Sequence, residues 1–254
     1  MLRSRIIPCL LVRNKGLVKT VQFKESKYVG DPINAVKIFN EKEVDELIIL
    51  DIDATKEKRE PDFKMIQNLA NESRMPLCYG GGVNTVEQAK KIIHLGAEKV
   101  ALSSAVINNP KLVVDIAKAV GVQSVIVVLD VKKKVFLGKY QVYTHNGTKS
   151  TGKSPKELAV QFEKLGVGEI VINSIDNDGM MKGYDLKLIE LIRSSINIPM
   201  TVLGGVGNLD HIKEVIKKYN VIGVAAGSLF VFKGKYKAVL INYPNKAEIK
   251  DLLK

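Results

Sequence analysis

Carboxylates that follow predicted strands are the side chains of this sequence best placed for acid–base chemistry. Asp130 ends one apolar run. Two further pairs, Asp51 with Asp53 and Asp176 with Asp178, follow other apolar runs. In α/β barrels the active site lies at the carboxyl ends of the strands, where a carboxylate can transfer protons. We interpret Asp53 as a helix-cap or turn residue. Asp130 has no evident structural role, so we interpret it as functional.

Small residues recur in two matching sets after other predicted strands. Each set has two adjacent glycines followed, one strand later, by a small polar pair. Glycine lets backbone amides approach an anion, and amides at a helix start favour a phosphate. Tight turns alone would explain one set, but two equivalent sets predict a ligand with a phosphate at each end. The sets are Gly81-Gly82 with Ser103-Ser104, and Gly204-Gly205 with Gly227-Ser228.

Charged residues stand at the opposite, amino-terminal ends of four predicted strands. They are Arg5, Glu46, Lys99 and Glu169, referred to below as the charged ring. If the strands close into a barrel, two cations and two anions at one end can form a ring around its axis. From chemistry alone, a stabilising ion network at that end is the preferred interpretation.

Cysteine and histidine give no sign of metal or nucleophilic chemistry. Cys9 and Cys78 lie in apolar runs without metal-type spacing, and we expect buried thiols in a reducing cytoplasm. His94 and His211 fall in helical patterns, and His145 falls in a long loop. We therefore expect no metal and no cofactor.

The composition is that of a soluble globular protein. The chain has 254 residues and a formal net charge of +12. No apolar run reaches the roughly 18 residues of a spanning helix, and no small-residue cleavage site follows the short apolar start, so we expect neither membrane insertion nor a signal peptide. Lysines alternate with acids along predicted helices and tryptophan is absent, which argues against nucleic-acid binding. A basic surface suits anionic small substrates or an acidic partner. We expect a cytoplasmic protein.

Eight short apolar runs are predicted as strands, with helices between them. The runs lack polar alternation, as expected for strands buried on both faces. Eight such units in a chain of about 250 residues predict a (β/α)8 barrel. A doubly wound sheet would show a glycine-rich turn after the first strand, and none is present. The predicted strands are 6–12, 46–52, 76–79, 99–102, 124–131, 169–173, 199–203 and 221–225.

Four helix starts have clear sequence signals. Asp31, Asn109 and Ser154 each precede a proline, a pattern that places a capping side chain before a first-turn proline. Ser154 with Glu157 also matches a capping box. Asp62, which itself follows a proline, opens the fourth helix.

An internal repeat supports a barrel made of two similar halves. "ELIILDID" at position 46 recurs as "EIVINSID" at 169, "GGV" recurs, and "ALSSA" matches "AAGSL", all at offsets of 123 or 124 residues. We predict one barrel over residues 1–254, with halves at about 1–120 and 121–254. An excursion at 131–152 is expected to form a small hairpin around Leu137 and Gly138 on the catalytic face. The same correspondence places Leu11 of the first strand opposite Asp130 of the fifth.

The chain resembles, over essentially its whole length, the cyclase subunit of imidazole glycerol phosphate synthase, an enzyme of histidine biosynthesis. The resemblance rests on "RIIPCL", "DELIILDI", "GGGV", "VVLDVK", "GEIVINSIDNDG" and "AAGSLF". It implies a lyase-type barrel subunit of a two-part glutamine amidotransferase. A glutaminase partner releases ammonia at the bottom of the barrel, and the ammonia passes along the axis to a substrate with two phosphates.

The resemblance also implies roles for particular residues. Asp130 matches one of two catalytic aspartates, and Lys19 matches a lysine that closes over the substrate. The charged ring matches an ammonia gate, which now becomes its preferred interpretation. The implied phosphate-binding positions fall on Gly82, Ser104, Gly179, Gly205 and Ser228, with Asp178 beside them.

One departure from the family pattern changes the expected chemistry. The second catalytic aspartate belongs at position 11, where this chain has Leu11. Leucine cannot exchange a proton, so we expect impaired ring closure with the ammonia apparatus retained. A subgroup that shares "GSLFVFKGKYKAVLINYP" is associated with surface-polysaccharide gene clusters. This association implies that ammonia passes to a separate sugar amidotransferase.

Four functions therefore stay open. The leading one is ammonia conduction for amination of a surface sugar, and the next is the ordinary cyclase reaction of histidine biosynthesis. A sugar-phosphate isomerase of the related histidine-pathway barrel would need an acid at both the first and fifth strands, so Leu11 argues against it. A purely structural or regulatory partner is the fourth.

Overall fold

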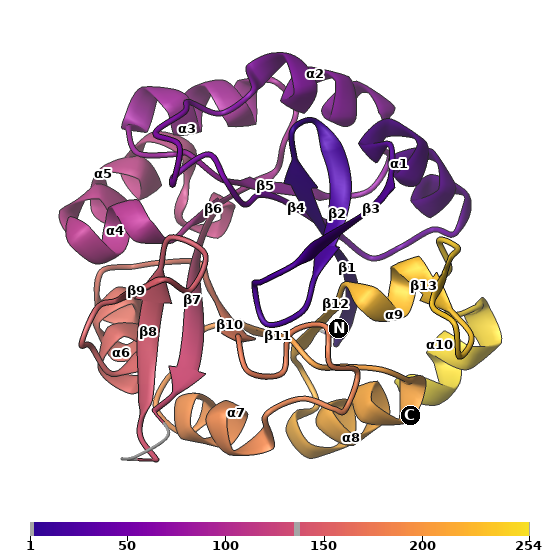
Figure 1. Cartoon of the computed structure of the whole chain (residues 1–254). Coiled ribbons are helices and arrows are strands. Elements are labelled where there is room, and N and C mark those ends of the chain that lie inside the picture. Colours follow the sequence, from indigo (N-terminus) through magenta and orange to yellow (C-terminus); the bar gives the residue numbers. More distant parts are fainter. Residues whose placement is uncertain (1–2, 135–137, 254) are drawn as a thin grey trace.

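Eight parallel strands close into a barrel, which confirms the predicted (β/α)8 fold (Figure 1). The computed structural model describes residues 3–134 and 138–253. The strands are hydrogen-bonded in the order in which they occur along the chain, and the last pairs with the first. They are β1 (Arg5–Arg13), β4 (Leu47–Asp51), β5 (Leu77–Gly80), β6 (Lys99–Leu102), β7 (Val125–Lys133), β10 (Glu169–Ser174), β11 (Met200–Leu203) and β12 (Gly223–Ala226).

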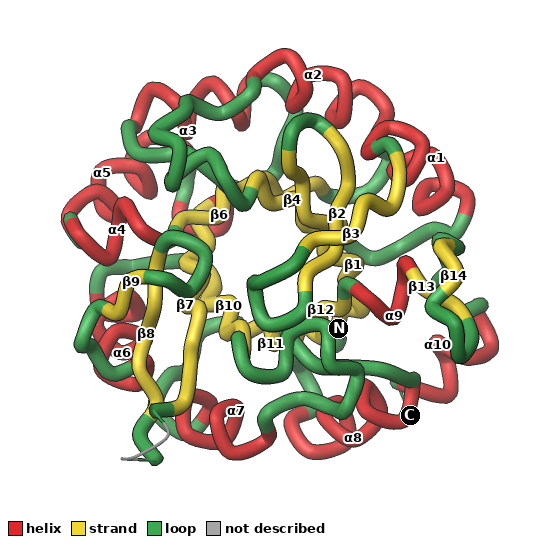
Figure 2. The backbone as a smooth tube through the Cα atoms, in the orientation of Figure 1, coloured by secondary structure: helices red, strands yellow, loops and turns green. Residues whose placement is uncertain are grey.

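Helices surround the barrel on all sides (Figure 2). Because side chains alternate along a strand, each strand contributes side chains to two cores. A large apolar cluster lies between the strands and the helices, and a smaller one lies inside the barrel. The helices are α1 (Pro32–Glu41), α2 (Phe63–Glu72), α3 (Val86–His94), α4 (Ser104–Asn108), α5 (Lys111–Val120), α6 (Pro155–Lys164), α7 (Leu186–Arg193), α8 (Leu209–Tyr219), α9 (Ser228–Val231) and α10 (Lys246–Leu252), with a 3-10 turn, η1 (Val122–Ser124).

The predicted helix caps are confirmed at three of four positions, although the capping box predicted at Ser154 lacks its reciprocal bond to the Glu157 side chain among the described hydrogen bonds. Asp31, Asp62 and Ser154 each accept a hydrogen bond from a backbone amide three residues on. The prediction for Asn109 is wrong, because Asn109 ends the short helix α4 and Pro110 itself stands at the cap of α5 without a side-chain bond. The α4 turn uses the residue that the sequence pattern assigned to the next helix.

Three antiparallel extensions decorate the barrel at the end where the strands have their carboxyl termini, called the mouth below. The excursion after β7 is a hairpin as predicted, with β7 pairing with β8 (Tyr140–Thr144) and β8 with β9 (Lys149–Ser150). Leu137 lies outside the described residues. The hairpin of β2 (Gly16–Thr20) and β3 (Ser26–Gly30), and that of β13 (Phe232–Lys233) and β14 (Ala238–Val239), were not expected from the sequence.

None of the described helices combines the length and apolarity needed to cross a membrane.

Candidate active site

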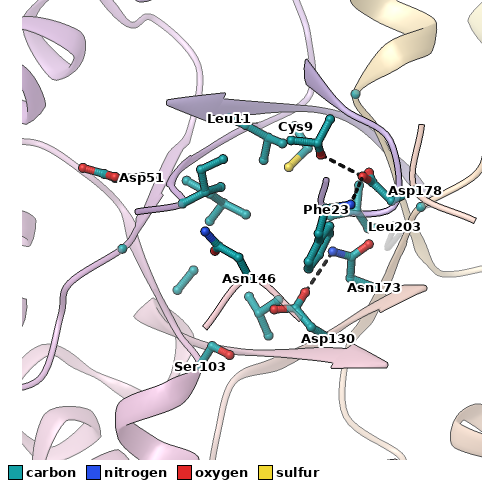
Figure 3. Close-up of a pocket in the computed structure, with 18 of the residues that line it drawn as sticks. Cys9, Leu11, Phe23, Asp51, Ser103, Asp130, Asn146, Asn173, Asp178 and Leu203 are labelled. Carbon is teal, nitrogen blue, oxygen red and sulfur yellow. Dashed lines mark hydrogen bonds between the residues drawn. The ribbon is translucent and has the colours of Figure 1, made fainter. Parts of the chain in front are cut away.

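A pocket opens at the mouth, where the carboxyl ends of the barrel strands converge (Figure 3). Its floor is apolar and its walls are formed by the turns that follow the strands. All but two of the mouth residues singled out in the sequence line this one pocket, which therefore brings together Leu11, Lys19, Asp130, Asp178, Gly179 and both predicted phosphate sets. The exceptions are Asp53 and Asp176, and the Asp176 carboxylate accepts from the backbone amide of Lys133 instead. The charged ring lies at the other end of the barrel.

Asp130 is held by a partner that the sequence did not single out. The amide nitrogen of Asn173, on the neighbouring strand β10, donates to Asp130 Oδ1 at 2.9 Å. Burial raises the pKa of Asp130 to about 6; the Asn173 bond opposes that rise, and the nearby Asp178 charge adds to it. A carboxyl with a pKa close to the working pH is suited to give and take protons. The alternation of side chains along β10 would have predicted that Asn173 faces inward, because it lies two positions beyond the inward-facing Val171.

Leu11 lies across the pocket from Asp130 (Figure 3). It sits on β1, where Leu50 of β4 is its neighbour in register. Together with Leu50 and Leu203 it packs against the apolar cluster inside the barrel. Leu11 is thus the upper end of an apolar lining, and it offers no group that could act with Asp130.

The two other acids of the pocket already have several partners. Asp51 accepts from the backbone amides of Asp53 and Ala54 and pairs with Arg59 at 3.0 Å. Asp178 accepts from Thr20 Oγ1 at 2.8 Å and from the backbone amide of Phe23, between β2 and β3. These bonds make Asp51 and Asp178 loop-ordering residues in this structure.

Asp53 was predicted to be a cap or turn residue, and that prediction is wrong. Its carboxylate pairs with Arg13 at 2.5 Å and accepts from Asn146 at 3.0 Å. The bond from Arg13 lowers the pKa of Asp53. The contacts connect the β1–β2 hairpin, the loop after β4 and the excursion after β7. It is Asp51, not Asp53, that organises the local turn.

Lys19 lies on β2 and is buried. Only 6% of it is exposed, and its Nζ donates to the backbone oxygen of Cys9 at 2.6 Å. Burial lowers its pKa, although the Asp178 carboxylate works in the opposite direction. An added Cβ on Gly227 would stand 3.2 Å from Lys19 Cε, so the lysine lies directly against one of the two predicted phosphate sets.

Both phosphate sets have the backbone form that a close turn requires. Gly82 and Gly205 have φ values of +74° and +106°, which side-chain-bearing residues rarely adopt. The small polar pairs begin the short helices α4 and α9. The hydroxyl of Ser103 is buried without a hydrogen-bond partner among the described residues. The turns alone account for the glycines, whereas the unpartnered Ser103 hydroxyl is a donor available to a ligand.

The charged ring is closed by alternating ion pairs. Arg5 donates to Glu46 and, at 2.6 Å, to Glu169. Lys99 Nζ donates to Glu46 at 2.8 Å and to Glu169 at 3.2 Å. Burial opposes charge on these groups, but the opposite charges outweigh it, raising the pKa of Arg5 and Lys99 and lowering that of Glu169. Thr201, also unpredicted, donates to Glu169 at 2.5 Å.

Metal chemistry has no visible site in the described part of the chain. No three histidine, cysteine, aspartate or glutamate side chains there are grouped so that they could hold an ion.

Comparison with known proteins agrees with this geometry. The family model described as "Histidine biosynthesis protein" matches residues 5–237. This chain belongs to that family. A Vibrio vulnificus relative that bears the provisional name imidazole glycerol phosphate synthase subunit hisF3 is 58% identical over all of this chain and 97% of its own length. A Pseudomonas aeruginosa relative provisionally named subunit hisF2 is 51% identical, covering 98% of this chain and 100% of its own. The HisF subunit of Lactococcus lactis is 40% identical over 91% of this chain and 89% of its own length. This HisF-like chain therefore belongs with the cyclase subunits of imidazole glycerol phosphate synthase.

Proposed function

We propose that this HisF-like chain is the barrel subunit of a glutamine amidotransferase that conducts ammonia but closes the imidazole ring poorly. A glutaminase would bind at the charged ring and release ammonia there. The ammonia would leave at the mouth for use by a separate enzyme, which we propose to be a sugar amidotransferase of surface-polysaccharide synthesis.

The side chains of β1 that point into the barrel support an ammonia path. Every second residue faces inward, so Arg5, Ile7, Cys9 and Leu11 follow one another from the charged ring to the mouth. Six residues of strand correspond to about 20 Å. Burial raises the pKa of Cys9 to about 12, so its thiol stays neutral. A neutral apolar lining suits NH3 and disfavours NH4+.

Leu11 is the observation that carries the proposal. It extends the apolar lining to the mouth and leaves Asp130 without a facing acid. The other pocket acids cannot readily take that place, because Asp51 and Asp178 are occupied by turn amides, Arg59 and Thr20. Removing one of two cooperating acid–base groups typically lowers the rate by about 10² to 10⁴.

The ordinary cyclase reaction is the second candidate, and two observations favour it. Asp130 keeps a pKa of about 6, and both phosphate sets line the same pocket. A pocket lined by both sets would accept an elongated substrate with a phosphate at each end, and Lys19 would lie beside one of the phosphates.

Deletion of the gene in the source organism separates the two candidates. We expect growth without histidine to be unaffected and an aminated surface sugar to be lost. Histidine auxotrophy with an unchanged surface sugar would contradict the proposal and favour the cyclase.

The conduction step has its own test in the complex with the glutaminase. Arg5→Ala opens the charged ring and should uncouple glutamine hydrolysis from product formation, while product formation from added ammonium chloride persists. Arg3→Ala is the matched control, because Arg3 pairs with Asp45 outside the ring. Equal coupling in both variants would refute a role of the ring in ammonia transfer.

A further inference from the structure

Positive charge is concentrated in two segments at the mouth. Residues 131–153 and 227–245 contain nine lysines and no acidic residue. These nine lysines amount to three quarters of the formal net charge of +12. Lysines alternate with acids along the predicted helices, but these two segments lack such acids. The first segment contributes Lys132, Lys133, Lys134, Lys139, Lys149 and Lys153, and the second Lys233, Lys235 and Lys237.

The two basic segments lie on opposite sides of the barrel opening (Figures 1 and 2). The first forms the hairpin of β7, β8 and β9. The second runs through α9, which starts at the mouth residue Ser228, into the hairpin of β13 and β14. Lys27 of β3 adds a further cation beside the second hairpin, with its Nζ 5.4 Å from the centre of the Phe232 ring.

These lysines are not neutralised within the chain. In the part of the chain that the structure describes, none of the nine has a carboxylate within ion-pair distance, whereas Lys213, Lys218 and Lys246 on other surfaces each have one. Lys153 donates to a backbone oxygen, and Lys133 lies 6.0 Å from the Tyr140 ring centre. Uncompensated charge of one sign at a cleft attracts a partner of the opposite sign.

The second hairpin also presents apolar side chains to solvent. Tyr236 is 90% exposed, Leu240 50% and Val239 44%. The hairpin is held firmly in this position, because the backbone amides of Leu240 and Asn242 donate to Val231 and Phe230. An exposed tyrosine with flanking aliphatic side chains is the kind of anchor that dominates protein–protein interfaces. A free phosphate or a soluble metabolite would leave these side chains uncovered.

We propose that the two basic hairpins together seat an acidic face of the ammonia-consuming enzyme over the mouth. The inference rests on the proposed function, because ammonia that reaches water at neutral pH is protonated and ceases to be a nucleophile. An enzyme that contacts both hairpins spans the opening and receives ammonia before water does. Tyr236 anchors it on one side, and the lysines orient it from both sides.

Charge reversal tests the surface without touching the pocket. Two variants, Lys133→Glu/Lys149→Glu and Lys235→Glu/Lys237→Glu, each alter exposed lysines of one hairpin. The matched control is Lys90→Glu/Lys118→Glu, which makes the same charge change on the exposed faces of α3 and α5. Each gene replaces the native one in the source cell, and the glutamine-dependent aminated product is measured with and without added ammonium chloride.

We expect each hairpin variant to lower the product roughly tenfold, as for charged interface residues that steer association. Added ammonium should restore it, and the purified variants should still stimulate the glutaminase. The control should match the wild type. If the wild-type gene itself is not needed for the product, the proposed function fails. If the gene is needed but charge reversal has no effect, only the docking inference fails.

Photocrosslinking identifies the occupant. A benzoylphenylalanine residue is placed at position 236 in one strain, at 149 in a second and at 90 as a control. We expect one and the same acidic protein to be captured from 236 and 149 but not from 90, and this protein should aminate its acceptor with ammonium alone. Different proteins from the two hairpins, or none, would overturn the inference. So would wild-type binding to phosphatidylserine vesicles or to a single-stranded oligonucleotide that the charge-reversed variants lose.

Discussion

Leu11→Asp is the substitution that tests the chemistry of the mouth most directly. It places an acid on the wall facing Asp130, at a position that packs against the apolar cluster inside the barrel with Leu50 and Leu203. Proton transfer by one well-placed group is typically worth about 10² to 10⁴ in rate, or about 3 to 5 kcal/mol of activation free energy. We therefore expect turnover of the cyclase substrate with ammonium chloride to rise by about that factor.

The same substitution should reduce stability. Leu11 is itself partly buried and packs against the apolar cluster inside the barrel. The substitution removes this packing and brings a carboxylate into the same pocket in which burial raises the pKa of Asp130. We expect the free energy of unfolding to fall by about 1 to 3 kcal/mol, which a urea titration would measure. The cost should shrink in acid, where the new carboxyl is protonated.

Leu11→Asn is the matched control for polarity. It has nearly the same size and hydrogen-bonding capacity as the aspartate variant but cannot transfer a proton. If both variants bind the substrate and the aspartate variant turns over no faster than the asparagine variant, the reasoning that Leu11 limits ring closure is refuted.

Three further predictions follow from other buried groups. Burial raises the pKa of Asp130 to about 6, above its value in the unfolded chain, so the ionisation of Asp130 lowers the stability of the fold as pH rises from about 4 through 6. Asp130→Asn should therefore raise the free energy of unfolding by up to about 3 kcal/mol at pH 8 and leave it unchanged near pH 4, as measured by urea titration. Glu169→Gln leaves two cations of the charged ring facing one carboxylate and should lower the free energy of unfolding by about 3 to 5 kcal/mol, whereas Thr201→Val should lower it by about 1 kcal/mol. Equal losses in the two variants would contradict the view that ion pairs hold the ring together. Lys19→Met keeps the length of the side chain but removes the cation beside Gly227, and calorimetry should show at least tenfold weaker binding of a bisphosphorylated substrate analogue; unchanged affinity would place that phosphate elsewhere.

Periodicity and repeat were sufficient to predict the barrel, because strands buried on both faces must be short and apolar and helices must cover them. The eight predicted runs overlap the eight strands of the barrel, with ends that differ by at most two residues. Asn109 was assigned wrongly because a cap pattern does not show which of two adjacent helices uses it. The hairpins of β2–β3 and β13–β14 were missed because their strands are short and partly polar.

At the site, residue types could be predicted and pairings could not. The sequence singled out Asp130 and the charged ring, since their positions at strand ends are unusual. It did not identify Asn173 or Thr201, whose roles depend on which strands are neighbours in the closed sheet. The Arg13–Asp53 pair joins residues that are distant along the chain, so Asp53 looked like an ordinary turn residue.

The alternation of inward-facing and outward-facing side chains along β1 restricts which mutations this protein can accept during evolution. Arg5, Ile7, Cys9 and Leu11 face the interior only because the strand keeps its pairing with β12 and β4. A single residue inserted into or deleted from β1 would turn the downstream side chains to the opposite face. Outward-facing side chains would then enter the barrel interior, and inward-facing ones would disturb the core between strands and helices. The proposed ammonia path can therefore be modified by substitution, one lining residue at a time, whereas the length of this strand must stay unchanged. Leu11, at the mouth end of the strand, is one such lining residue, and a substitution there leaves the pairing of β1 unchanged.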